Sequence, residues 1–346
     1  MRLKLFEGDC LRIKWVDRAK GLAIVLVVLG HVILGLIRSK QYTVFDNNCM
    51  RYIIETLYAF HMPVFFALSG MFFKSVTNFK ELFSLTKNKL LALGIPYIAF
   101  SVVMFSLQKI GSGSVRDQTS LSQLLNIYKQ PIGYLWFLYV LFFVFAYIGF
   151  ISIFIKNDTH ILLIVIFGYI IASIFNIPIF FIQSTLVWAP MFYLGHILKN
   201  MNLKINKTTM LLLFVYFIHV PIFRVLHPST DYASQINPQI WGIFSVIGII
   251  LGFSFLPLLQ HVSVKGLSFI GQNTLVVYLV HAPTASVIRI ILFKLGIYNI
   301  PINIIVGFGV SLAISLIAVY LSERVRLIKL VFYPLRKQKI EVITHD

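Results

Sequence analysis

Charged side chains are scarce in this sequence of 346 residues, where they make up 12% of the chain against 58% for hydrophobic residues. This composition and a mean hydropathy of +0.86 exclude a soluble globular domain. The sequence also lacks a GxSxG nucleophile elbow, an HExxH zinc motif, a glycine-rich phosphate loop and the HxxxxD pattern of glycerolipid acyltransferases. The common signatures of soluble catalysis are therefore absent, and any activity has to come from a membrane domain.

Cysteine and carboxylate side chains are few as well. The two cysteines, Cys10 and Cys49, flank the first apolar run, so we expect them on opposite faces of a membrane and unpaired. None of the twelve carboxylates falls inside a predicted apolar core, and we interpret Glu55 as a solvated loop charge. Because proton-coupled transporters commonly carry a membrane-embedded Asp or Glu, this absence weakens a transport function.

Long apolar runs dominate what is present, and they predict an all-α polytopic membrane protein. Both termini are predicted to be cytoplasmic. Asn176 and Pro178 mark either a tight turn or a broken helix between the fifth and sixth spans. About ten transmembrane helices are predicted, near residues 20–37, 57–73, 90–108, 134–155, 161–176, 178–198, 208–225, 241–258, 267–293 and 300–322.

The basic residues favour this topology. Of the 30 lysines and arginines, 21 fall on the predicted cytoplasmic side and nine on the outer side, as the positive-inside rule expects. The net charge of +18 is scattered through short loops, so we predict anionic membrane lipids as partners and no nucleic acid. The chain divides into a cytoplasmic N-terminal segment (1–19), a single transmembrane domain (20–322) and a basic cytoplasmic tail (323–346).

Two ionisable side chains lie in the first apolar run, Lys20 at its cytoplasmic end and His31 eleven residues further along. A helical rise of ~1.5 Å per residue separates them by ~16 Å, which places His31 near the middle of the membrane. A neutral histidine there can act as a general base, whereas the alternative is a histidine that only hydrogen-bonds a neighbouring helix. For Lys20, composition alone favours a positive anchor at the membrane surface.

Further histidines lie within the predicted spans. His61 in the second span lies at a depth similar to that of His31, and the two can face one cavity if their helices pack side by side. His219 and His281 are also intramembrane, with the same structural alternative. No pair of histidines has the HxxxH or HxH spacing typical of metal ligands, so we predict no metal site.

Four segments of the chain, taken together and in order, form one further pattern. The first contains Lys20, ten residues and then His31. Phe60–Phe73 (FHMPVFFALSGMFF), Tyr134–Leu138 (YLWFL) and Tyr278–Pro283 (YLVHAP) follow it in order. Together these segments resemble the integral-membrane acyltransferase 3 family, and within it the fucose 4-O-acetylase-like and surface-polysaccharide O-acetyltransferases. The resemblance covers the chain from about residue 15 to 325.

The resemblance implies an enzyme that takes an acyl group, usually acetyl from acetyl-CoA, and places it on a carbohydrate hydroxyl. It implies that His31 is the catalytic residue and that Lys20, with Arg18 beside it, binds acyl-CoA at the cytoplasmic mouth. Ser69 can instead bond its own helix, and Trp136 can instead belong to the interfacial aromatic belt. The candidates for the substrate cavity are His61, Ser69, Trp136 and His281.

The resemblance thus predicts a membrane O-acyltransferase with acetyl-CoA or another acyl-CoA as donor substrate, no bound cofactor, and a cell-surface or lipid-linked carbohydrate as acceptor. Family usage implies the bacterial plasma membrane. His31 either deprotonates the acceptor hydroxyl or becomes acylated itself, and the sequence does not separate these routes. Two alternatives are a transporter or flippase for a glycan or lipid-linked precursor, and a non-catalytic partner in a polysaccharide synthesis complex.

Overall fold

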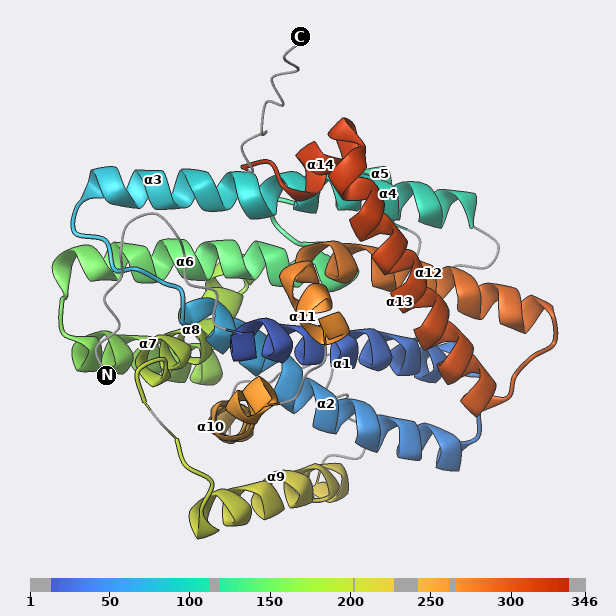
Figure 1. The fold of residues 1–346 in the computed structure, drawn as a ribbon, viewed down its shortest axis with the longest axis horizontal. Helices are drawn as coiled ribbons and strands as arrows, with labels where there is room; N and C mark the ends of the chain where they lie inside the picture. Colours follow the sequence, from blue (N-terminus) through green and yellow to red (C-terminus); the bar gives the residue numbers. More distant parts are fainter. Residues whose placement is uncertain (1–13, 112–118, 202, 227–241, 262–264, 336–346) are drawn as a thin grey trace, which may run out of the picture.

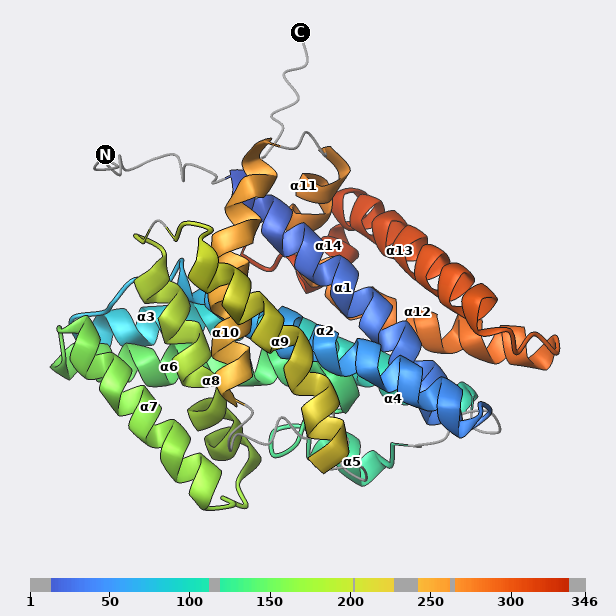
Figure 2. The ribbon, with the colours of Figure 1, turned by 90° about the horizontal axis from the view of Figure 1, so that it is seen from below.

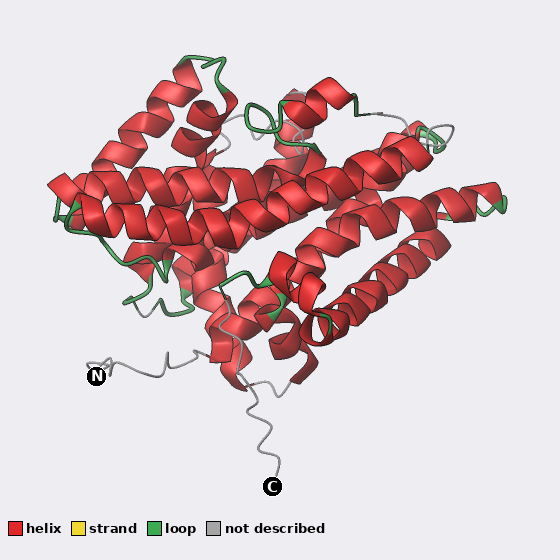
Figure 3. Cartoon of the chain, turned by 90° about the horizontal axis from the view of Figure 1, so that it is seen from above, coloured by secondary structure: helices red, strands yellow, loops and turns green. Residues whose placement is uncertain are grey.

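The computed structural model describes residues 14–111, 119–201, 203–226, 242–261 and 265–335, and over these residues the chain forms helices and no strand (Figure 3). The predicted all-α class is therefore confirmed. Cys10, most of the predicted N-terminal segment and the end of the predicted tail lie outside the described residues. Cys49 is exposed and is a free cysteine.

The described residues form fourteen α-helices and three other short helices, which Figure 1 shows in chain order by colour. Three of the described helices are not α-helices. They are the π-helix η1 (Leu90–Gly94) and the 3-10 helices η2 (Gly133–Leu135) and η3 (Leu256–His261). The α-helices are α1 (Lys14–Ser39), α2 (Val44–Gly70), α3 (Phe79–Lys89), α4 (Ile95–Ile110), α5 (Leu121–Leu125), α6 (Trp136–Phe154), α7 (Asp158–Ile174), α8 (Phe180–Leu198), α9 (Lys207–Leu226), α10 (Gly242–Phe255), α11 (Lys265–Gln272), α12 (Thr274–Lys294), α13 (Ile300–Arg324) and α14 (Arg326–Phe332).

Eight helices within the described residues are long and apolar enough to cross a membrane, which supports a multi-pass membrane protein. The shorter helix α7 is followed by α8, and Asn176 and Pro178 lie in the turn between them. Each predicted span overlaps a described helix. The number of crossings and the sides of the two termini stay predictions.

The structure differs from the sequence prediction over 267–293, where it has two helices in place of one. The break between α11 and α12 lies at Asn273, whose side chain donates to the Phe269 carbonyl at 2.9 Å. The same side chain accepts from the Tyr333 hydroxyl at 2.6 Å. Asparagine side chains that bond nearby backbone compete with helical hydrogen bonds, and such a short interruption does not change the hydropathy of a long window.

The second helix begins before the predicted span 57–73, because Thr43 caps it by accepting from the Asp46 amide at 3.1 Å. The helix therefore carries Glu55 into the bundle, where this residue is fully buried and pairs with Arg224 of α9 at 3.4 Å. The interpretation of Glu55 as a solvated loop charge is wrong. The interpretation failed for two reasons. The polar first turns of α2 lower the local hydropathy, and the cation that compensates the charge of Glu55, Arg224, comes from a distant helix.

In the centre of the bundle, α2 joins two groups of helices (Figures 1 and 2). On one side α1 packs against α11, α12 and α13, so the first helix lies beside the last ones. On the other side α8 packs against α6 and α7, and α2 contacts both α1 and α8. Helix α9 lies at the periphery, against α10 and α2 (Figure 2).

Two glycines allow α2 and α8 to approach each other closely. A Cβ atom added to Gly70 would overlap the Phe192 carbonyl oxygen, and one added to Gly195 would overlap the Ala67 carbonyl oxygen. Small residues let membrane helices pack backbone against backbone in this way. The glycine pair fixes the position of α2, which carries His61.

The connection between α1 and α2 contains Lys40 with φ of 57°, in the left-handed region. A lysine in this conformation costs about 1 kcal/mol or more relative to glycine, because its Cβ crowds the backbone. The Lys40 amide donates to the Ile37 carbonyl at 3.3 Å and so ends α1. The chain thus reverses direction at a residue that is unfavourable for the turn it makes.

Candidate active site

His31 lies on α1, and its Nδ1 is 3.0 Å from the Val27 carbonyl oxygen. Because a carbonyl oxygen only accepts, Nδ1 carries the proton of the neutral ring and the lone pair is left on Nε2. The residue keeps part of its surface exposed, whereas Val27 and most of its other neighbours on the helix are buried. His31 therefore combines an acceptor nitrogen, Nε2, with a side chain that is not fully buried, as a general base or a nucleophile requires.

His281 of α12 lies next to His31, with 4.8 Å between the ring centroids and the ring planes at 78°. It is fully buried, and its Nδ1 is 3.0 Å from the Val277 carbonyl oxygen. Its Nε2 has no hydrogen-bond partner among the described residues. A buried acceptor without a partner costs about 1–3 kcal/mol, so it calls for a catalytic role or a bound molecule.

His61 of α2 joins this group through Tyr58, whose ring centroid lies 4.7 Å from that of His61 and 6.1 Å from that of His31. Helix α1 packs on α2 at Gly30, where an added Cβ would lie 3.7 Å from the His61 ring. The prediction that these two helices pack side by side is confirmed. His61 is fully buried, and neither of its ring nitrogens has a hydrogen-bond partner in the described part of the chain.

Two tyrosines hold α12 beside the start of α6. The Tyr134 hydroxyl donates to the Leu279 carbonyl at 2.6 Å, and the Tyr278 hydroxyl donates to the Tyr134 carbonyl. Their ring centroids lie 5.7 and 5.8 Å from that of His281. Neither tyrosine is among the residues predicted from the sequence, although each begins one of the segments that resemble the family. Both position His281.

Lys20 lies toward the beginning of α1, with its Nζ 4.5 Å from the centroid of the Phe72 ring. Lys89, the last residue of α3, is near enough for its charge to interact with that of Lys20, and its Nζ lies 3.8 Å from the centroid of the Phe145 ring. Two neighbouring cations attract an anion more strongly than one. Lys89 is not predicted from the sequence, and it directly precedes the π-helix η1, a feature that is frequent at functional sites.

Arg18 connects the beginning of α1 to segments that come late in the chain. Its Nη1 donates to the Leu259 carbonyl at 2.6 Å, and its Nε donates to the Ser268 hydroxyl at 3.3 Å. These bonds hold η3 and α11 against the first turns of α1. Contact between Arg18 and acyl-CoA stays a prediction. Such a contact would have to use the N–H groups of the guanidinium that do not take part in these two hydrogen bonds.

Trp136 lies in an aromatic cluster, with its ring centroid 6.4 Å from Phe66 and 5.4 Å from Trp188. Its link to the histidine group runs through Phe137, which contacts both Trp136 and Tyr278. The Ser69 hydroxyl donates to the Phe65 carbonyl at 2.8 Å, within its own helix. Roles for Ser69 and Trp136 toward a substrate stay predictions.

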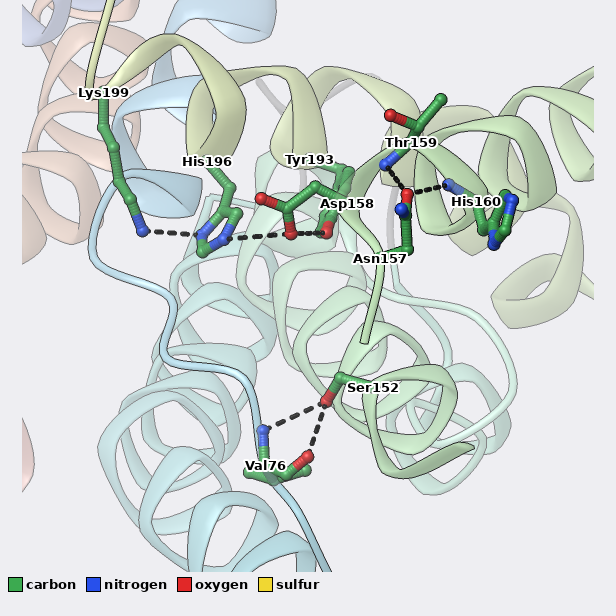
Figure 4. A network of polar contacts seen from close by, with 9 residues as sticks. All are labelled: Val76, Ser152, Asn157, Asp158, Thr159, His160, Tyr193, His196 and Lys199. Atoms are coloured by element: carbon green, nitrogen blue, oxygen red, sulfur yellow. Dashed lines mark hydrogen bonds and ion pairs between the residues drawn. The ribbon is translucent and has the colours of Figure 1, made fainter. Parts of the chain in front are cut away.

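A separate polar network joins α7 to α8 (Figure 4). The Lys199 Nζ is 3.2 Å from His196 Nδ1, and His196 Nε2 is 4.0 Å from an Asp158 oxygen that also accepts from the Tyr193 hydroxyl at 2.8 Å. Burial lowers the pKa of Lys199, and the Asp158 charge opposes this shift. Because both ring nitrogens of His196 face partners, this histidine holds helices together and is not an available base.

The structure thus places three predicted histidines, His31, His61 and His281, in one group inside a helical bundle, with Lys20 toward one end of it. Over the described residues, no group of three or more His, Cys, Asp or Glu side chains is placed to hold a metal ion. The chemistry that these side chains can supply is proton transfer and nucleophilic attack by neutral imidazole. The fold and this group of side chains together define the class of protein: a multi-pass membrane protein with imidazole side chains inside its helical bundle.

Residues 13–320 match the model of the Acyltransferase domain of the acyltransferase 3 family, and the chain belongs to this family of membrane acyltransferases. Its members need an acyl donor and an acceptor. The chain is 28% identical over 139 residues to Nodulation protein NolL of Mesorhizobium japonicum. That match covers 40% of this chain and 35% of the relative, about a third of its length. No solved structure matches the chain.

Proposed function

We propose that this acyltransferase moves an acetyl or other acyl group from acyl-CoA to a hydroxyl of a carbohydrate, at the plasma membrane of a bacterium. The observation that carries the proposal is the state of His31, whose Nδ1 contacts the Val27 carbonyl and so leaves the lone pair on Nε2, beside a second imidazole inside the bundle. The cations Lys20 and Lys89 support a donor that carries phosphates. Family membership supports the acyl transfer itself.

In the direct route, His31 Nε2 takes the proton from the acceptor hydroxyl while the oxygen attacks the thioester carbonyl. The carbon–sulfur bond breaks, and the resulting thiolate of CoA takes the proton back from the imidazolium ring. The products are the ester and free CoA thiol, and His31 returns to its neutral form. Val27 holds the ring orientation through both proton transfers, because Nδ1 keeps its own proton throughout.

In the alternative route, His31 Nε2 attacks the thioester, the carbon–sulfur bond breaks, and CoA leaves as the thiolate. The acceptor hydroxyl then attacks the acyl group on the ring, the bond to Nε2 breaks, and the hydroxyl proton passes to the thiolate of CoA. The two routes differ in one observable. Protein that is incubated with acyl-CoA and no acceptor, then digested and analysed by mass spectrometry, carries an acylated His31 only in this second route.

The test of the proposed function is transfer of label by the purified protein in lipid vesicles. Isotope-labelled acetyl-CoA is supplied with surface carbohydrate from cells that lack the protein, and empty vesicles serve as the control. We expect the label in ester linkage on the carbohydrate. Movement of an unmodified carbohydrate across the vesicle membrane, without ester formation, would contradict the proposal.

Transport of a glycan or a lipid-linked precursor is the second candidate function, and Glu55 favours it. This carboxylate lies within a candidate membrane span and pairs there with Arg224. Embedded ion pairs of this kind occur along transport pathways. The vesicle experiment separates the two functions, because a transporter moves its substrate without changing its mass.

Replacing Lys20 with alanine is expected to raise the KM for acetyl-CoA about tenfold while kcat changes little, because a phosphate contact contributes binding more than chemistry. Initial rates over a range of acetyl-CoA concentrations measure this. Lys80, an exposed lysine at the start of α3, gives the control variant Lys80→Ala, which should keep the wild-type KM. An unchanged KM in Lys20→Ala would make this residue a surface anchor.

A further inference from the structure

A cleft of about 410 Å³ lies at the opposite end of α1 from Lys20, where α1 ends and α2 begins. Its volume is that of a small-molecule site, for which the usual range is roughly 300–1,000 Å³. Polar and cationic side chains from three segments of the chain surround it. These are Lys40, Tyr42, Asn47, Asn48, Arg51 and Arg224.

The cleft carries an excess of positive charge. Of its cations, Arg224 is paired with Glu55 and lies 3.5 Å from the Asn48 side-chain oxygen. Lys40 and Arg51 have no carboxylate among the residues that line the cleft. Beside the lining cations, Arg289 and Asp46 lie close enough for their charges to act on Tyr42. Four cations against the two carboxylates of Glu55 and Asp46 favour an occupant with two negative charges, such as a diphosphate, over a single carboxylate.

Two buried polar atoms of the cleft residues have no partner among the described residues: the Tyr42 hydroxyl and Asn47 Oδ1. The orientation of Asn47 is fixed, because its Nδ2 donates to the Tyr42 and Thr43 carbonyls at 3.0 and 2.9 Å. Its Oδ1 is therefore an acceptor that an anion cannot satisfy but a hydroxyl group can. The cleft thus suits a molecule with both negative oxygens and hydroxyl groups, as a phosphorylated carbohydrate has.

The left-handed backbone of Lys40 is a separate observation at the same place. Glycine or asparagine would form this turn more easily, so the fold gains nothing from a lysine at this position. Unfavourable backbone conformations of this kind cluster at functional sites. The lysine side chain supplies the cleft with one of its cations.

The cleft also lies within reach of His31. Ile37 lines it and is six residues beyond His31 on α1, which corresponds to ~9 Å of helical rise. On α2, Arg51 is seven residues from Tyr58, or ~10.5 Å, and the Tyr58 ring lies 6.1 Å from that of His31. A short stretch of carbohydrate can bridge this separation.

We propose that this cleft binds a phosphate or diphosphate group of the carbohydrate acceptor and so directs a hydroxyl of the attached sugar toward His31. The inference rests on the proposed function, and it names the class of acceptor. The phosphate can come from two sources, the diphosphate that links a sugar to a lipid or a phosphodiester within the glycan.

The first experiment measures binding of inorganic pyrophosphate to the full-length protein in nanodiscs of zwitterionic lipid, at constant ionic strength. We expect Lys40→Gly and Arg51→Gln each to weaken binding roughly tenfold or more. The control Lys129→Gln removes an exposed cation that does not line the cleft, and it should bind as the wild type does. Lys40→Gly should unfold at the wild-type temperature or above, because it removes the left-handed lysine.

Pyrophosphate also resembles the phosphates of CoA, so Lys20→Ala serves as a second control. Binding that survives Lys20→Ala and is lost in Lys40→Gly assigns the site to the cleft. Equal losses in Lys129→Gln and Lys40→Gly would overturn the inference, as would binding that depends on Lys20 alone. These measurements need no acyl transfer, so failure of the proposed function would be seen separately, in the labelling experiment.

The second experiment compares acceptors in the transfer reaction. One is a sugar joined through diphosphate to a short isoprenoid chain, and the other is a soluble oligosaccharide with an internal phosphodiester. Arg51→Gln should raise the acceptor KM at least several-fold for whichever of the two is the substrate, with the acetyl-CoA KM unchanged. Transfer with a wild-type acceptor KM in both cleft variants would overturn the inference while leaving the proposed function intact.

Discussion

The His31→Ala protein is expected to insert and fold as the wild type does but to transfer acyl groups about 10²–10⁴-fold more slowly, the range that a general base contributes. The reason is the position of the proton on the neutral imidazole ring. Nδ1 is occupied by the Val27 carbonyl, so Nε2 is the nitrogen that receives a proton or an acyl group, and alanine has no substitute for it. Initial rates with labelled acetyl-CoA measure the loss.

Two further variants make this result specific. His31→Gln keeps a polar side chain of similar reach, yet it cannot take up a proton near neutral pH, so it should be as slow as His31→Ala. His160→Ala removes an exposed histidine in the first turn of α7 and should keep the wild-type rate. Full activity in His31→Ala would remove His31 from the mechanism, and equal elution volumes on gel filtration would show that the proteins compared are folded.

The second large effect is expected at the contact between α2 and α8. A Gly195→Ala substitution adds a Cβ atom that overlaps the Ala67 carbonyl oxygen. The Cβ is bonded directly to the α8 backbone and the oxygen belongs to the α2 backbone, so neither can move away without separating the helices. We expect a loss of about 3 kcal/mol or more in the free energy of unfolding. Thermal unfolding of the detergent-solubilised protein, followed by its loss of monodispersity, measures the change.

Gly309 of α13 provides the matched control, because an added Cβ at this position meets no atom within 4 Å. Gly309→Ala also exchanges glycine for alanine inside a helix, so it should leave the stability unchanged or raise it by up to about 1 kcal/mol. If Gly195→Ala unfolds at the same temperature as Gly309→Ala, the two backbones do not need their close approach.

The helices of the bundle could be predicted because hydropathy is a property of neighbouring residues. The same local view fails for Glu55, whose charge is balanced by Arg224 from a helix 169 residues further along the chain. Within a short window of sequence, Glu55 is an isolated carboxylate next to polar residues, and this pattern predicts a side chain exposed to water. Only the packing of α9 against α2 shows that the carboxylate has a partner inside the bundle.

The candidate active site, too, could be predicted only in part from local sequence. Spacing along α1 and α2 is enough to predict that His31 and His61 lie close together, because a short connection joins these two helices. His281 could be added only through the resemblance to a family, since no spacing rule connects residues 31 and 281. Tyr134 and Tyr278 act through contacts with each other's segments, so their part in holding His281 becomes visible only in the folded chain.

The contact between α1 and α12 has a consequence for the biogenesis of the protein. Helix α1 precedes α12 in the chain, so His31 enters the membrane before His281, and Arg18 meets its partners on η3 and α11 only after those segments have been synthesised. Contacts so far apart in sequence form late, after the intervening helices have inserted. A nascent chain that still lacks α12 therefore carries His31 without its neighbouring imidazole, and the group of three histidines is complete only after α12 has been synthesised.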